Sequence, residues 1–154
     1  MYQYVVVILA IWILVGCAGP ATKRQAPYSL EIVENWTGDY PVSALGRLPK
    51  GQRDTPVGWL DESHFSSVWA AFKPGSEAPR VDFFRQLVVF VRNTEFYNRM
   101  QIAQVQLVDG VAEVIAMETM SAMPIQDRVA MALVVVPKKG IRALRLGSVK
   151  IPLR

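Results

Sequence analysis

Residues 86–92, "QLVVFVR", form a continuous run of β-branched and aromatic residues at the centre of the predicted fold. Between its terminal glutamine and arginine, apolar side chains follow one another without a polar interruption. A short continuous apolar run of this kind is typical of a central β-strand that is buried on both faces. Residues 128–137, "RVAMALVVVP", have the same character. These two runs predict the buried centre of a β-sheet.

A β-hairpin is predicted between the two buried runs. The segments "MQIAQVQLV", residues 100–108, and "VAEVIAM", residues 111–117, flank the pair Asp109-Gly110. An Asp-Gly pair between two strand-like segments is a strong hairpin signal, because both residues tolerate the positive φ of a tight turn.

The ends of the chain carry weaker strand signals. Residues 28–36, "YSLEIVENW", predict a first strand, and residues 143–151, "ALRLGSVKI", predict a last edge strand broken by Gly147. Residues 37–58 are rich in glycine, proline and charge and are predicted mostly as a loop, with a short strand at 40–44 as the alternative.

One amphipathic helix is predicted in "WLDESHFSSVWAAFKPG", residues 59–75. Asp61 or Ser63 can cap its N-terminus, and Lys73, Pro74 and Gly75 end it. Its apolar stripe consists of Phe65, Val68, Trp69 and Phe72. The predicted fold class is therefore α+β: a mainly antiparallel β-sheet with one amphipathic helix packed on it, in a single domain of residues 28–154.

The chain begins with an apolar run, "YVVVILAIWILV", residues 4–15, followed by "GCAG". The run suits the apolar region of a secretory signal and is shorter than the roughly 20 residues of a membrane-spanning helix. Leu14, Val15, Gly16 and Cys17 resemble the lipobox of bacterial lipoproteins.

The lipobox resemblance implies a signal peptide at residues 1–16 and an acylated Cys17 as the first mature residue. Two or three acyl chains make a stable membrane anchor. Residues 17–27 would form a lipidated flexible tether. Ala18 follows the cysteine, where an aspartate would imply inner-membrane retention, so the expected location is the outer membrane, facing the periplasm. Because no Lys or Arg precedes the apolar run, an uncleaved signal anchor is the alternative.

The body of the chain resembles the C-terminal domain family of the protease-complex subunit PrcB. The resemblance rests on "FSSVWAAF", "VDF", "LVVFV", the Asp-Gly hairpin and "ALVVVPK", with Trp69, Gly110 and Pro137 as fixed points. It implies a small secreted or lipid-anchored domain that is not an enzyme.

Three methionines suggest a metal site. Met117, Met120 and Met123 are spaced by three residues, and thioethers are soft ligands that select Cu(I). The alternative is that Met117 ends a strand and the other two fill gaps around a loop. His64, beside Asp61 and Ser63, is predicted to belong to a helix N-terminus, and Asp82 to a turn. We expect no catalytic site and no cofactor.

Basic residues dominate the last part of the chain, although the whole sequence has only 17 basic and 13 acidic residues. No acid follows Asp127. The basic residues after it are Arg128, Lys138, Lys139, Arg142, Arg145, Lys150 and Arg154. Such a surface would attract anionic lipid headgroups, an anionic polysaccharide or an acidic partner; ordinary solubilising charge is the alternative. Nucleic acid is not expected in the predicted compartment.

Together these patterns predict a lipid-anchored, non-enzymatic binding or accessory subunit of a cell-envelope complex. It would contact a protein partner through a sheet edge or through the basic surface. The alternative is a periplasmic ligand- or metal-binding module that uses the methionines.

Overall fold

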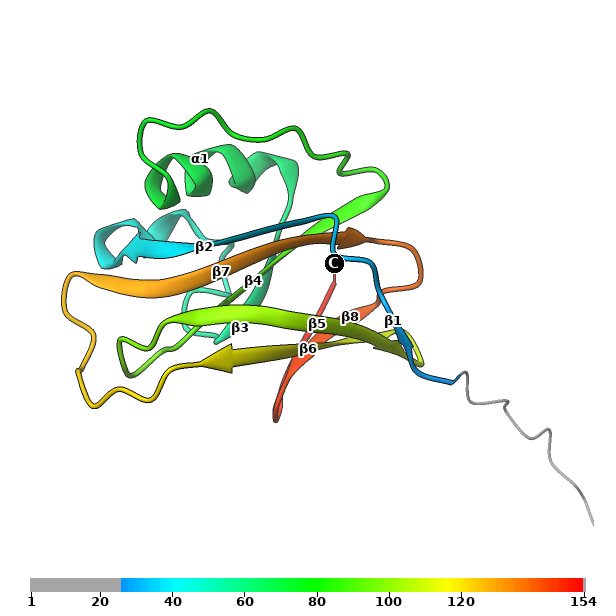
Figure 1. The fold of residues 1–154 in the computed structure, drawn as a ribbon. Coiled ribbons are helices and arrows are strands. Elements are labelled where there is room, and N and C mark those ends of the chain that lie inside the picture. The colour runs from blue at the N-terminus through cyan, green and yellow to red at the C-terminus, as the bar shows by residue number, and fades with distance from the viewer. Residues whose placement is uncertain (1–25, 154) are drawn as a thin grey trace, which may run out of the picture.

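The computed structural model describes residues 26–153 (Figure 1). The predicted signal peptide, Cys17 and most of the predicted tether lie outside the described residues, as does Arg154. Within the described part, the predicted α+β class is confirmed. The strands, however, form two sheets rather than one.

The strands divide between a five-stranded and a four-stranded sheet. The five-stranded sheet has the order β1 (Tyr28–Ser29), β5 (Met100–Val108), β6 (Val111–Glu118), β8 (Ala143–Leu146) and β9 (Val149–Pro152). The four-stranded sheet has the order β2 (Glu34–Pro41), β7 (Arg128–Pro137), β4 (Gln86–Arg92) and β3 (Val57–Leu60). Neighbouring strands are antiparallel, except that β6 and β8 are parallel.

The molecule has three layers, with the four-stranded sheet in the middle (Figure 1). One face of this sheet packs on the five-stranded sheet, and its other face packs under α1 (Glu62–Phe72) and the 3-10 helix η1 (Val42–Arg47). The central strands β4 and β7 therefore contribute alternate side chains to two cores. This explains why both were uninterrupted apolar runs, as a strand buried on both faces must be.

The prediction that residues 37–58 are mostly loop is wrong. β2 continues to Pro41, η1 follows at once, and β3 begins at Val57. Tyr40 fixes this corner, because it is fully buried and its hydroxyl donates a 2.8 Å hydrogen bond to the Ala44 carbonyl. Burial raises the pKa of Tyr40 to about 12.

Both terminal strand predictions also need correction. The segment predicted as one strand at 28–36 is divided, because Leu30 enters the core between the sheets and the chain crosses from β1 to β2. The predicted last strand is a hairpin of β8 and β9, with Gly147 in its turn at φ 55°.

The sandwich has two opposite ends, the hairpin end and the groove end. The hairpin end holds the Asp109-Gly110 turn, the 138–142 loop, the 82–85 turn and the start of β1 at Tyr28 (Figure 1). The groove end holds the 93–99 loop, the 119–127 loop, the last residues of β2 and the first residues of β5 and β7.

Candidate functional site

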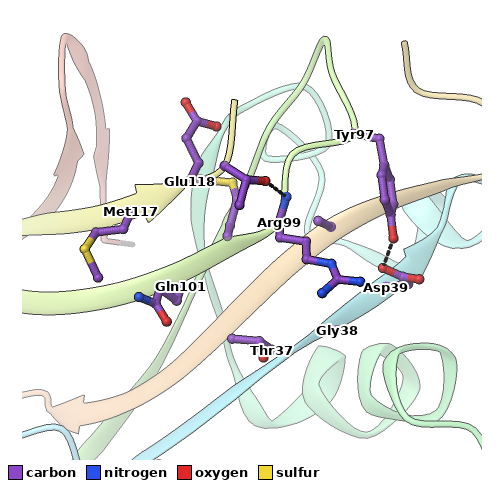
Figure 2. Close-up of a pocket in the computed structure, with 11 residues that line it drawn as sticks. Thr37, Gly38, Asp39, Tyr97, Arg99, Gln101, Met117 and Glu118 are labelled. Atoms are coloured by element: carbon purple, nitrogen blue, oxygen red, sulfur yellow. Dashed lines mark hydrogen bonds between the residues drawn. The ribbon is translucent and has the colours of Figure 1, made fainter. Parts of the chain in front are cut away.

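A groove of about 600 Å³ opens at the groove end, between β2 of one sheet and β5 of the other (Figure 2). Its residues come from segments far apart in the sequence. They are Thr37, Gly38 and Asp39 of β2, Ala130 of β7, Tyr97 and Arg99, Met100 and Gln101 of β5, Met117 and Glu118 of β6, and Thr119.

The groove lies between two sheet edges that differ in how they are covered. On β2, the ammonium of Lys73 donates a 2.7 Å hydrogen bond to the Thr37 carbonyl, which occupies an edge acceptor. On β5, strand β1 pairs with Gln106 and Leu107, and the Leu30 N–H that follows it donates to the Val105 carbonyl at 2.8 Å. No described strand pairs with residues 100–104 on that side. A bulge between Ile102 and Gln104 interrupts this edge. The open backbone therefore runs from Met100 to Ile102.

The acidic side chain on the β2 wall is already occupied. Asp39 accepts a 2.5 Å hydrogen bond from the Tyr97 hydroxyl, drawn in Figure 2, and its other carboxylate oxygen lies 3.4 Å from the Arg128 guanidinium. The hydrogen bond to Asp39, together with partial burial and the negative charge of this carboxylate, raises the pKa of Tyr97. The Tyr97–Asp39 contact ties the 93–99 loop to β2 and fixes that wall.

The second acid of the groove is also engaged, whereas the arginine beside it is not. Glu118 accepts hydrogen bonds from the side-chain amides of Asn93 at 2.9 Å and Asn98 at 3.4 Å. The side chain of Arg99 extends across the groove toward β2 (Figure 2). No carboxylate of the described residues lies within salt-bridge distance of its guanidinium. The groove thus offers an unpaired positive charge beside an open strand edge.

A buried arginine lies behind this region. Arg92 ends β4 with 3 % of its surface exposed, and it lines a smaller cavity of about 210 Å³ together with Asn93 and Glu118. Its guanidinium donates to the Arg53 carbonyl, and its Nε has no hydrogen-bond partner among residues 26–153. Burial lowers the pKa of Arg92, an effect that the nearby Asp54 charge opposes.

The three predicted methionines all lie at the groove end. Met117 is 52 % exposed, Met120 97 % and Met123 60 %, and Met117 also lines the groove. The interpretation of Met120 and Met123 as gap-filling side chains is therefore wrong, because gap filling requires burial. Phe96, 40 % exposed, pairs with Pro124 in the same region. These side chains give the groove an apolar surrounding.

His64, Ser63 and Asp61 form a helix cap. The Asp61 carboxylate accepts from the His64 backbone N–H at 2.9 Å and from the Ser63 hydroxyl at 2.7 Å, and it lies 2.7 Å from His64 Nδ1. A hydrolytic triad requires serine and carboxylate on opposite ring nitrogens, whereas both contact Nδ1 here. Burial acts to raise the pKa of Asp61, but the hydrogen bonds from Ser63 and His64 outweigh it, so the pKa is lowered.

Asp82 occupies a turn, as predicted. Its carboxylate accepts from the Phe84 backbone N–H at 3.1 Å, and its carbonyl accepts from the N–H groups of Arg85 and Gln86 at 2.9 and 2.7 Å. The side chain thereby sets the backbone that leads into β4.

The predicted basic surface is divided among three places. Arg128 lies at the groove end, where it contacts Asp39 and Asp127. Arg145 and Lys150 are cross-strand neighbours on β8 and β9, and Arg145 forms an ion pair with Glu113 of β6. The remaining three, Lys138, Lys139 and Arg142, are exposed together on the 138–142 loop at the hairpin end.

The described residues contain no group of three His, Cys, Asp or Glu side chains placed to hold a metal ion. Residues 26–153 also include no helix long and apolar enough to cross a membrane. Comparison with protein-family models, with curated proteins and with solved structures finds no match to this chain. The resemblance to the PrcB C-terminal domain family stays a prediction.

Sequence reasoning did not identify the groove residues Asp39, Tyr97 and Arg99. Their positions in the chain are separated by a helix and two strands, so no spacing signals that they meet. The polar segment "NTEFYNRM", residues 93–100, between two apolar strands was the available signal, because a loop that carries an aromatic and a basic residue is a common place for a binding site.

Proposed function

We propose that this chain is a lipid-anchored, non-enzymatic binding or accessory subunit of a cell-envelope complex, and that its groove holds an extended, acidic segment of a protein partner. The observation that carries the proposal is the unpaired Arg99 guanidinium beside the open edge of β5. The resemblance of residues 14–17 to a lipobox supports the anchor, with the outer membrane facing the periplasm as the expected location.

The backbone of β5 provides the first part of the proposed contact with the partner segment. An extended segment that adds to a free sheet edge forms main-chain hydrogen bonds, which provide affinity for many sequences. Residues 100–102 present such an edge before the bulge. Because Lys73 already occupies the Thr37 carbonyl, β5 is the better of the two walls for this addition.

The charged side chains of the groove provide the second part of the proposed contact with the partner segment. Asp39 already contacts the Arg128 guanidinium, whereas Glu118 accepts from two neutral amides and keeps its negative charge. Arg99 is the groove-lining cation that has no carboxylate partner among residues 26–153. A partner carboxylate can meet a guanidinium through two parallel hydrogen bonds. Where the partner segment passes Arg99, an acidic side chain is therefore favoured over a basic one.

The apolar surroundings complete the contact. Exposed methionines adapt their shape to different partners, since their side chains are unbranched and polarizable. Met117 lies in the groove, and Met120, Met123 and Phe96 lie on the adjoining loops. Protein interfaces are enriched in methionine, aromatic residues and arginine, which are the residue types gathered here.

The test is a comparison of pull-downs. The native protein is recovered from membranes in mild detergent, and co-purifying proteins are identified by mass spectrometry. Arg99→Glu should remove the specific partner, whereas Lys150→Glu, a charge reversal at an exposed position of the five-stranded sheet, should retain it. In the recovered complex, hydrogen exchange should slow at residues 100–102. Failure to recover any specific partner would exclude the accessory-subunit function.

A second candidate is Cu(I) binding by Met117, Met120 and Met123. The observation in its favour is that all three side chains are more than half exposed and available to a metal. Thioether ligands select Cu(I). In equilibrium dialysis against a competing Cu(I) chelator, a protein that retains copper would support this candidate, provided that replacing the three methionines by leucine abolishes retention.

A further inference from the structure

We infer that the hairpin end rests on an anionic phospholipid surface, with Phe84 inserted among the headgroups and with Lys138, Lys139 and Arg142 against lipid phosphates. This inference rests on the proposed lipid anchor. It concerns the end of the molecule opposite the groove, and it assigns a partner to the three basic residues of the 138–142 loop.

The first observation is the place where the described chain begins. Tyr28 pairs with Leu107 of β5, one residue short of the end of that strand. Leu107 lies beside the 138–142 loop, because a Cβ on Gly140 would be 3.2 Å from its side chain. Tyr28 follows Cys17 by eleven positions, so a fully extended tether would reach at most about 40 Å. The hairpin end is therefore the end that an acylated Cys17 holds nearest to the membrane.

The second observation is an apolar side chain exposed beside this loop. Phe84 has 89 % of its surface exposed, although its neighbour Phe83 packs against the core. Tyr28, 44 % exposed, lies at the same end. An isolated exposed aromatic ring at the tip of a turn is suited to the headgroup level of a bilayer.

The third observation is that the loop with the basic residues is hydrogen-bonded to the turn that contains Phe84. The Lys138 backbone N–H donates a 2.8 Å hydrogen bond to the Arg85 carbonyl, which joins the 138–142 loop to the 82–85 turn. Arg142 donates from its backbone to the Gly110 carbonyl at 2.7 Å and from its guanidinium to the Asp109 carbonyl at 2.7 Å, which joins the same loop to the hairpin. Three turns thus form one tip, as Figure 1 shows.

The charge of this tip is positive. The turns 82–85, 109–110 and 138–142 contain four basic residues and two acids, so their net charge is +2. The basic residues are Arg85, Lys138, Lys139 and Arg142, and the acids are Asp82 and Asp109. Asp82 lies 3.9 Å from Arg85 and accepts from the Phe84 backbone. Three further acids lie beside this tip: Glu31 on the crossing from β1 to β2, Glu34 at the start of β2, and Asp61, which lines a small cavity together with Lys138. The positive charge that would attract lipid therefore belongs to the three turns and not to the whole hairpin end.

The experiment uses the acylated full-length chain. Phe84→Cys and Met120→Cys are each labelled with a polarity-sensitive dye, since the native chain has one cysteine and acylation blocks its thiol. The two positions are matched, being apolar and 89 % and 97 % exposed at opposite ends. Each protein is reconstituted into phosphatidylcholine vesicles with and without phosphatidylglycerol, and dye emission and quenching by acrylamide are measured.

If the hairpin end docks on lipid, the emission of the dye at position 84 should be blue-shifted in the anionic vesicles, and this dye should be protected from acrylamide. The dye at position 120 should be quenched by acrylamide in both kinds of vesicle. Replacing Lys138 and Lys139 by Gln should reduce the ratio of docked to undocked protein about 25-fold, which corresponds to about fivefold for each lysine near an anionic surface. Raising the salt from about 0.1 M to about 1 M should also release the dye at position 84, since the Debye length falls from about 10 Å to about 3 Å.

Two outcomes overturn the inference in different ways. If mass spectrometry finds acyl chains on Cys17 but position 84 is quenched as readily as position 120, the anchor stands and the docking is wrong. Binding of the hairpin end to an acidic protein instead of lipid would give that same result. If Cys17 carries no acyl chain, the proposed anchor fails, and the docking that depends on it fails too.

Discussion

The two ends of the sandwich differ in what they present to solvent. The hairpin end consists of tight turns whose backbone groups bond to one another, so it presents side chains: Phe84, two lysines and Arg142. The groove end includes the open part of β5, so it presents main chain as well as the guanidinium of Arg99. A surface of side chains suits a flat, unstructured partner such as lipid, whereas an open strand edge suits another extended chain.

The largest effect is expected when the charges of the two ends are changed separately. Arg99→Glu should weaken partner binding about 100-fold, about 2.7 kcal/mol, as for the loss and reversal of a charge within an interface. It should leave the dye at position 84 protected in anionic vesicles. Replacing Lys138 and Lys139 by Gln should have the reverse pattern. If either variant impairs both activities, the two ends do not act independently.

The second largest effect concerns one glycine from each end. Gly110 has φ 83° in the Asp109-Gly110 turn, and a Cβ there would lie 2.4 Å from Arg142 Nε. Gly110→Ala should therefore destabilise the protein by about 2 kcal/mol, from left-handed strain and the displaced arginine. At Gly38 a Cβ would lie 3.0 Å from the flexible end of Lys73 and 3.2 Å from the buried Phe72 ring, so Gly38→Ala should destabilise the protein by about 1 kcal/mol, less than Gly110→Ala. Urea denaturation measures both, and equal values would contradict the difference between the ends.

The smallest effect concerns the helix cap near the hairpin end. Asp61→Ala should destabilise the protein by about 1 kcal/mol at neutral pH, because the cap of α1 is lost. Since folding lowers the pKa of Asp61, its charged form stabilises the fold above the ordinary carboxyl pKa of about 3.9, and this stabilisation is lost as the pH falls through the lowered value.

Asp61→Asn is the matched control for that prediction. Asparagine caps a helix about as well as aspartate but does not titrate in this range. Its free energy of unfolding should therefore stay close to that of the native protein at neutral pH and should not contain the acid-dependent part. Thermal unfolding measured from neutral pH to below pH 4 separates the two variants. A stability difference between the native protein and the Asp61→Ala variant that is independent of pH would contradict the cap as described.

Those parts of the fold that depend on local pattern were predictable. β4 and β7 have the predicted limits, because each needs an apolar side chain on both faces. The Asp109-Gly110 hairpin and the helix after Asp61 follow from residues adjacent in sequence, namely a pair that accepts positive φ and a carboxylate that caps. In these elements the local chemistry and the final structure agree.

β2 and β3 were missed because their glycines were interpreted as loop signals. A Cβ on Gly58 would lie 2.2 Å from the Phe90 ring, and one on Gly38 would lie 3.2 Å from the Phe72 ring. Both glycines are therefore in strands because large aromatic side chains cross them. That reason depends on residues more than thirty positions away, and no local pattern carries it. The groove was unpredictable for the same cause, since Asp39 and Tyr97 meet only after the sheets have packed.

The parallel pairing of β6 with β8 constrains the order in which the two sheets can form during folding. Between these two strands the chain leaves the five-stranded sheet, builds β7 in the other sheet and returns. The last strand, β9, is fixed to β3 by the Trp59 indole N–H, which donates to the Pro152 carbonyl at 3.3 Å. A chain whose residues 143–152 have not yet left the ribosome therefore has an incomplete sheet and an uncovered core. Folding is therefore completed only after the whole domain has been synthesised.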